Sequence, residues 1–145
     1  WPCAVPAEVL AGFAASLARD HDKTVRDFLS LQLRGDTRAA TLLRTLRALL
    51  AASPAPDPAA LAAGLNILAH TDLRTQLPAL AHPALVLAGE RDRLTPAAAG
   101  EALAAALPEG RCRVLAGAAH APFLTHGDDF TAAVESFLGG AEAAI

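Results

Sequence analysis

Two short apolar runs constrain the fold of this chain more than any other feature. Residues 84–88 are aliphatic, residues 112–116 are largely apolar apart from Arg113, and a glycine follows each run. Residues 96–107, between the runs, and residues 128–138, after the second run, have helical character, with Asp128 or Asp129 placed to cap the last helix. An alternation of strand, helix, strand and helix predicts parallel strands joined by crossover helices. This part of the chain therefore predicts an α/β fold.

Residues 7–69 have a different pattern, which predicts four helices. Apolar side chains recur three and four residues apart, and no strand pattern appears. Residues 20–22 supply a cap for the second helix, and residues 35–37 end it and begin the third. A proline-rich stretch, residues 53–58, ends the third helix and begins the fourth with a proline in its first turn.

The composition is that of a folded chain with a thin core. Hydrophobic residues make up 53% of the chain and the mean hydropathy is +0.33, which argues against disorder, but aromatic residues are only 4%. The apolar runs are interrupted well before the roughly 20 residues that cross a bilayer, and no leader pattern opens the chain, so we expect a soluble cytoplasmic protein. The spacing of the cysteines and histidines suggests no metal site.

One carboxylate and one histidine follow the two apolar runs at the same spacing. Asp92 lies in GERDRLTP (residues 89–96) and His120 lies in GAAHAPF (residues 117–123), each four residues after a run. Because neighbouring parallel strands end at one sheet edge, we expect the two side chains to meet. A serine nucleophile needs a histidine base oriented by a carboxylate. The alternative is structural: a turn aspartate and a packed histidine.

The nucleophile that such a pair would serve has no setting in this chain. The four serines do not lie in a GxSxG motif: Ser16, Ser30, Ser53 and Ser136. The chain also begins at Trp1 rather than at a methionine. We therefore expect the C-terminal part of an enzyme whose serine lies in a preceding N-terminal half, and we expect this part alone to be inactive.

Several segments resemble a known family. GERDRLTP, HPALVLAG and GAAHAPF resemble the acid and histidine segments of the α/β-hydrolase fold, in which serine, acid and histidine follow in that order. DFLSLQ, GLNIL with TDLR, and AAHAPF resemble the carboxylesterases that hydrolyse pimeloyl-acyl-carrier-protein methyl ester in biotin synthesis. The resemblance runs from Trp1 to about Leu138. It implies a helical lid in residues 1–75, followed by the C-terminal part of the hydrolase core in residues 76–145.

The resemblance also implies site residues. Asp92 and His120 would complete the Ser-His-Asp triad of a serine carboxylesterase that needs no cofactor. The segment expected to contact the acyl chain, beside His120, consists of Phe28, Leu29, Ser30, Leu31 and Gln32. Phe28 and Leu31 share one helical face, which suits an apolar channel, although packing between lid helices is the alternative.

The resemblance further implies that the acyl ester is carried on acyl-carrier protein, an acidic partner. The basic candidates for that contact are Lys23, Arg26, Arg38, Arg44 and Arg47. The match is partial, because Asp27 and Ala40 stand where bases would be expected, and a solvated helix surface is the simpler interpretation. Neither nucleic acid nor membrane is indicated. Two other functions stay open: a general α/β-hydrolase acting on small esters or lactones, and a non-catalytic helical interaction module.

Overall fold

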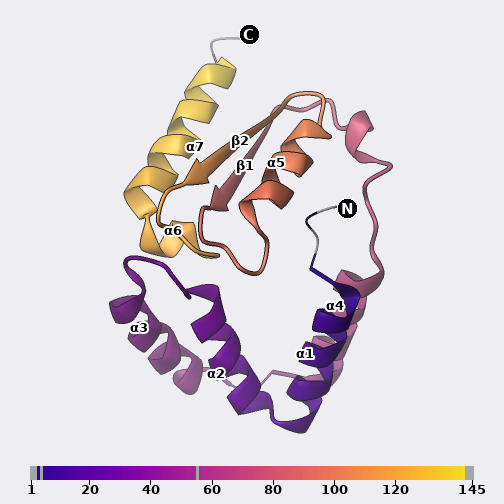
Figure 1. The fold of residues 1–145 in the computed structure, drawn as a ribbon, viewed down its shortest axis with the longest axis vertical. Helices are drawn as coiled ribbons and strands as arrows, with labels where there is room; N and C mark the ends of the chain where they lie inside the picture. Colours follow the sequence, from indigo (N-terminus) through magenta and orange to yellow (C-terminus); the bar gives the residue numbers. More distant parts are fainter. Residues whose placement is uncertain (1–2, 4, 55, 143–145) are drawn as a thin grey trace.

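The molecule has a helical part at one end and a strand-containing part at the other. The computed structural model describes residues 3, 5–54 and 56–142. Trp1 and Ala55 of the predicted lid and residues 143–145 of the predicted core therefore lie outside the described residues. The carboxyl ends of both strands point toward the helical part, residues 7–70 (Figure 1). Loops that leave the strands therefore lie between the two parts.

Four helices form the helical part, which confirms the predicted pattern. They are α1 (Ala7–Arg19), α2 (His21–Gln32), α3 (Ala39–Ala52) and α4 (Pro58–His70). The predicted cap of α2 is present: the Asp20 side chain accepts a hydrogen bond from the Lys23 N–H at 3.0 Å. Helix α4 has a cap that was not predicted, because the Asp57 side chain accepts a hydrogen bond from the Ala59 N–H at 2.9 Å. Helix α1 packs against α2 and α4, and α2 packs against α3.

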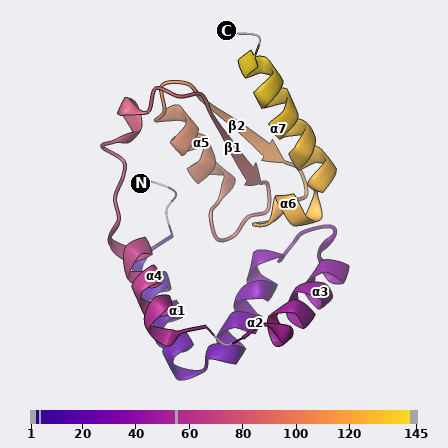
Figure 2. The ribbon, with the colours of Figure 1, turned by 180° about the vertical axis from the view of Figure 1, so that it is seen from behind.

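The predicted parallel strands are also confirmed. β1 (Ala84–Gly89) pairs with β2 (Gly110–Leu115), and Gly89 lies opposite Leu115 at the carboxyl end. Helix α5 (Ala97–Ala105) crosses between them, and α7 (Gly127–Glu142) follows. Helices α5 and α7 flank the strand pair (Figure 2). This arrangement delivers both strand-end loops to one edge.

The core beside that edge consists of small aliphatic side chains, as the alanine-rich composition suggests. Among the described residues, the buried apolar side chains include Leu33, Ala88, Ala104, Leu115, Ala118, Ala119, Ala121 and Ala133. Most of them belong to the strand ends and to the segment after β2. In the described part of the chain, no helix is long and apolar enough to cross a membrane.

Three local features differ from the sequence-based expectations. Helix α7 begins at Gly127, so Asp128 and Asp129 lie in its first turn, and the prediction that one of them is its N-cap is wrong. Their charges still favour the positive end of the helix dipole. Two short elements were not predicted, α6 (Pro122–Thr125) and the 3-10 turn η1 (Leu77–Ala79), because elements this short show no periodicity.

Candidate active site

Asp92 and His120 are in direct contact at the strand-end edge. Nδ1 of His120 lies 2.9 Å from Oδ2 of Asp92. The Asp92 side chain is 5% exposed, whereas the His120 side chain is 35% exposed. With the proton on Nδ1, the ring donates to the carboxylate and keeps Nε2 free to accept a proton. The pair therefore has the geometry of an oriented general base.

The acid loop, residues 89–96, holds the Asp92 carboxylate through its own donors. Oδ1 of Asp92 accepts from the N–H groups of Leu94 and Thr95 at 2.8 and 2.9 Å, and Oδ2 accepts from the Thr95 hydroxyl at 2.8 Å. Burial alone raises the pKa of Asp92, but the hydrogen bonds from the Thr95 backbone, His120, the Thr95 hydroxyl and the Leu94 backbone outweigh it and hold the pKa below 3.8. Asp92 is therefore ionised at neutral pH.

Thr95 is a member of this site that the sequence reasoning missed. Its hydroxyl oxygen lies 3.3 Å from Nδ1 of His120 as well as 2.8 Å from Oδ2 of Asp92. The signal was present, because an aspartate followed three residues later by threonine is typical of a turn closed by side-chain to backbone hydrogen bonds.

Two glycines allow the acid loop to meet the histidine loop, residues 117–123, for different reasons. Gly117 has φ of +73°, which confirms that a residue without Cβ is needed to turn off β2. Gly89 has no positive φ, so a left-handed turn is not what requires glycine at this position. A Cβ on Gly89 would instead lie 2.0 Å from the carbonyl oxygen of Ala119. The two loops are therefore too close together to leave room for a side chain at Gly89.

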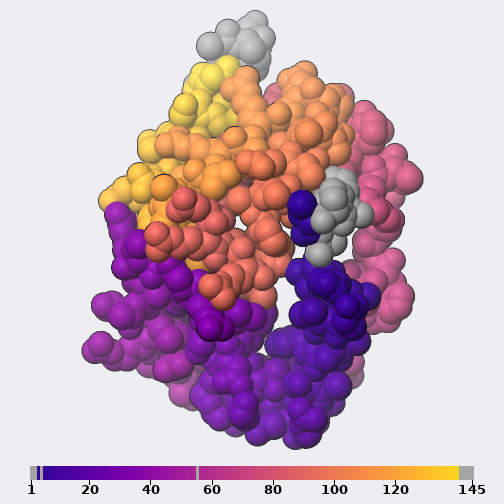
Figure 3. All heavy atoms as spheres, in the orientation of Figure 1, coloured from indigo at the N-terminus to yellow at the C-terminus, as the bar shows by residue number. Residues whose placement is uncertain are grey.

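A pocket of about 970 Å³ opens beside the Asp–His pair. Asp92, Thr95 and His120 line it together with residues 69–74, residues 86–89 and three residues of α5. The space-filling view shows an opening between α1, in indigo, and the orange strand-containing part (Figure 3). The volume is in the range of small-molecule sites.

The predicted acyl-chain segment, residues 28–32, does not line this pocket. Phe28 and Leu31 line a second pocket of about 570 Å³ between α1 and α2, and the Phe28 ring centroid lies 5.0 Å from that of Phe13. Leu29 is half-buried on the same helix. Contact of these residues with an acyl chain stays a prediction.

The two polar residues of that segment are engaged within the chain. The Gln32 carbonyl accepts a hydrogen bond from the His120 N–H at 3.0 Å, so the end of α2 touches the histidine loop. The Ser30 hydroxyl donates to the Arg26 carbonyl and accepts from Arg47, both at 2.9 Å. Of the five residues, Gln32 is thus hydrogen-bonded to a triad candidate.

Within the described residues, His120 has no serine hydroxyl as a hydrogen-bond partner. Ser16 accepts from Arg19, and Ser53 donates to the Leu49 carbonyl, both within the helical part. The described residues also contain no group of three His, Cys, Asp or Glu side chains that could hold a metal ion. The chemistry that the Asp92–His120 contact offers is proton transfer.

Comparison with known proteins identifies similar chains. The family model for the alpha/beta hydrolase fold matches residues 4–127. The pimeloyl-[acyl-carrier protein] methyl ester esterase of Xanthomonas axonopodis pv. citri (strain 306) is 45% identical over 138 residues, which cover 95% of this chain and 54% of the relative. The enzyme of the same name from Xylella fastidiosa (strain M12) is 44% identical over 140 residues, covering 95% and 55%. The chain spans about half the length of these curated relatives.

Solved structures show the same fold. A hydrolase from Pseudomonas aeruginosa PA01 superposes with a TM-score of 0.76 at 29% identity, covering 94% of this chain and 52% of the other. A thermophilic esterase from Thermogutta terrifontis superposes with a TM-score of 0.74 at 25% identity, covering 92% and 50%. In both cases the matched part is about half of the solved chain.

Proposed function

The chain belongs to the α/β-hydrolase family, and from that premise we propose that Asp92 and His120 are the acid and the base of a Ser-His-Asp triad in a carboxylic ester hydrolase. The observation that carries the proposal is the 2.9 Å contact between Nδ1 of His120 and an ionised, nearly buried Asp92 carboxylate. The serine is proposed to come from residues outside this chain, since the chain spans about half the length of its curated relatives.

In the proposed reaction, Nε2 of His120 removes the proton from the serine hydroxyl as the serine oxygen attacks the ester carbonyl. The imidazolium then gives that proton to the departing alcohol, leaving an acyl-serine. His120 next takes a proton from water, whose oxygen attacks the acyl carbon, and returns the proton to the serine oxygen as the acid leaves. Throughout, Asp92 holds the Nδ1–H tautomer and stabilises the charged ring.

We further propose that the substrate is the methyl ester of a pimeloyl group carried on acyl-carrier protein, the substrate in the names of the curated relatives. The helical part, with residues 1–75 as its proposed limits, would act as a lid over the core in residues 76–145. The end of α4 already lines the pocket beside His120, which supports a lid role. A cytoplasmic location, expected from the sequence, belongs to this proposal.

The carrier-protein contact is proposed for the exposed basic residues of α2 and α3. Lys23, Arg38 and Arg47 each bind a group within the chain: a carboxylate, a carbonyl and a hydroxyl, respectively. Arg26 and Arg44 are exposed on α2 and α3 and are the stronger candidates for steering an acidic partner.

The test uses the protein expressed from the complete reading frame. We expect hydrolysis of the carrier-bound pimeloyl methyl ester in preference to free short esters, and we expect His120→Ala to lower kcat by about 10³-fold or more. His82→Ala, an exposed histidine outside the pocket, is the matched control. Hydrolysis of short free esters with none of the carrier-bound ester would overturn the substrate assignment. A reading frame without a GxSxG serine, or an active His120→Ala protein, would overturn the triad.

A further inference from the structure

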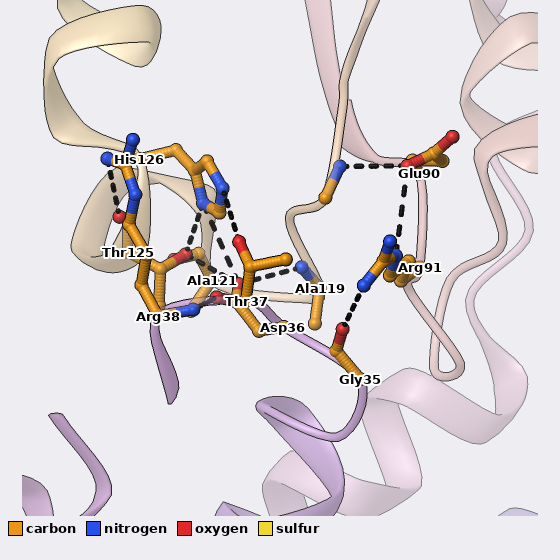
Figure 4. Close-up of polar contacts among 11 residues, drawn as sticks. Gly35, Asp36, Thr37, Arg38, Glu90, Arg91, Ala119, Ala121, Thr125 and His126 are labelled. Carbon is orange, nitrogen blue, oxygen red and sulfur yellow. Dashed lines mark hydrogen bonds and ion pairs between the residues drawn. The ribbon is translucent and has the colours of Figure 1, made fainter. Parts of the chain in front are cut away.

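A buried carboxylate joins the turn between α2 and α3 to the histidine loop (Figure 4). Asp36, in that turn, has a side chain that is 0% exposed. Its Oδ2 accepts from the Ala119 N–H at 3.0 Å and from the Thr125 hydroxyl at 2.7 Å, and its Oδ1 accepts from the Arg38 N–H at 2.7 Å. His126, whose side chain is 5% exposed, places Nδ1 3.7 Å from Oδ2. Asp36 thus links segments more than 80 residues apart in the sequence.

Backbone groups of the same turn follow the histidine loop. The Gln32 carbonyl accepts from the His120 N–H at 3.0 Å, and the Thr37 N–H donates to the Gly117 carbonyl at 3.3 Å. Gln32 and residues 35–38 are here called the clasp. The clasp therefore holds the histidine loop at its first residue and at two consecutive N–H groups, those of residues 119 and 120.

The clasp also touches the acid loop. Nη1 of Arg91 donates to the Gly35 carbonyl at 2.9 Å, and the Glu90 carboxylate accepts from the Gly117 N–H at 2.8 Å (Figure 4). Asp92 follows these residues directly. One turn of the helical part is consequently bound to the loops that carry both triad candidates.

The charge on Asp36 suits this role. Burial alone raises the pKa of Asp36, but the N–H groups of Ala119 and Arg38, the Thr125 hydroxyl and the nearby His126 outweigh it and hold the pKa below 3.8. A charged acceptor forms stronger hydrogen bonds than a neutral one, so the Ala119 N–H is firmly held.

We propose that Asp36 is a positioning residue for His120. Peptide units are planar, so hydrogen bonds to the consecutive N–H groups of Ala119 and His120 fix the peptide plane that enters the His120 Cα and the plane before it. These planes set the position from which the His120 ring reaches Asp92 at 2.9 Å. The inference rests on the proposed function, because it needs His120 as the base. Since the Gln32 carbonyl at the end of α2 accepts from the His120 N–H, the position of α2 also affects the orientation of His120.

The test is Asp36→Asn in the complete protein. Asparagine has the same size, but its NH₂ group must face either the Ala119 N–H and the Thr125 hydroxyl or the Arg38 N–H, so not all the donors can be satisfied. We expect kcat for the methyl ester to fall about tenfold with KM within twofold, because the base moves and the substrate contacts do not. Asp22→Asn, which changes an 81% exposed carboxylate on α2, is the control and should change neither.

A spectroscopic readout separates positioning from a loss of folded protein. The Nδ1–H proton of His120, assigned by its absence in His120→Ala, should give a low-field NMR signal in wild-type protein that weakens or shifts in Asp36→Asn. If Asp36→Asn fails to fold, Thr125→Val removes one donor to Oδ2 and is expected to lower kcat about threefold at unchanged KM.

The outcomes distinguish this inference from the proposed function. A wild-type protein that hydrolyses no ester overturns the proposed function. If the wild-type protein is active and Asp36→Asn retains kcat and the low-field signal, the role of Asp36 alone is overturned. The same result for Thr125→Val overturns that role where Asp36→Asn does not fold.

Discussion

Adding one methyl group at Gly89 tests whether the close approach of the acid and histidine loops controls activity. In Gly89→Ala the new Cβ would lie 2.0 Å from the carbonyl oxygen of Ala119 and 2.6 Å from that of Ala118. Both are backbone atoms, so neither can turn aside as a side chain would. The Ala119 N–H is also bound to Asp36 at 3.0 Å. The loops must separate to admit the methyl group.

The size of the separation follows from the contact distances. Ordinary contact begins at 3.4 Å, so the Ala119 carbonyl must move away by about 1.4 Å. His120 is the next residue, and a shift of that size takes its 2.9 Å contact with Asp92 out of hydrogen-bond range. A misplacement of about 1 Å costs about 10²-fold in rate, close to 2.7 kcal/mol of barrier. Overpacking should lower the free energy of unfolding by about 1–3 kcal/mol.

The assay is kcat/KM of the complete protein for the methyl ester, with urea unfolding measured on the same preparation. Gly64→Ala is the matched control, because a Cβ on Gly64, within α4, would meet no heavy atom within 4 Å. That control should keep kcat/KM and gain about 0.5–1 kcal/mol of stability, since alanine loses less backbone entropy in a helix. A Gly89→Ala protein with wild-type kcat/KM would refute the reasoning, because the loops would then have room that the structure denies.

Two further predictions concern the acid. Asp92→Asn should lower kcat by about 10³- to 10⁴-fold, because a neutral amide can no longer stabilise a charged His120. The protein should stay folded, because the amide oxygen can still accept from the Leu94 and Thr95 N–H groups. Steady-state kinetics and circular dichroism check the two expectations. Thr95→Val removes the hydroxyl donor to Asp92 and should raise the pKa of Asp92 toward 3.8. A carboxylate whose pKa is lowered on folding stabilises the folded protein above pH 3.8, and this stabilisation is lost as the pH falls through the lowered pKa. In Thr95→Val, the increase in unfolding free energy from acidic to neutral pH should therefore be smaller than in the wild type by about 1 kcal/mol, as measured by urea titration. An unchanged increase would contradict the role assigned to Thr95.

The sequence predicted most of the elements because their signals are local. Apolar spacing of three and four residues identified α1 to α4, and Asp20 and Asp57 cap the helices that follow them. The two short apolar runs, each followed by a glycine, identified the parallel strands. Short elements escaped prediction: α6 and η1 are four and three residues long, too short for a period to appear.

Much of the site's supporting structure could not be predicted from the sequence. Asp36 carried only the signal of a turn residue, and its hydrogen bond to the Arg38 N–H fits that signal. Its bonds to Ala119 and Thr125 join the two parts of the molecule. His126 had no distinctive setting in the sequence, yet it is buried beside Asp36.

The sequence by itself determined that an aspartate and a histidine would leave neighbouring strands at one edge, because parallel pairing requires a crossover and brings both carboxyl ends together. Only the tertiary structure decided how closely their loops approach and what holds them. The lack of room at Gly89 depends on how the acid loop packs against the histidine loop. The donors that Asp36 receives from Ala119 and Thr125 depend on how the helical part docks against the segment after β2. Local patterns record neighbours a few residues apart, whereas docking depends on the shape and charge of surfaces assembled from distant segments.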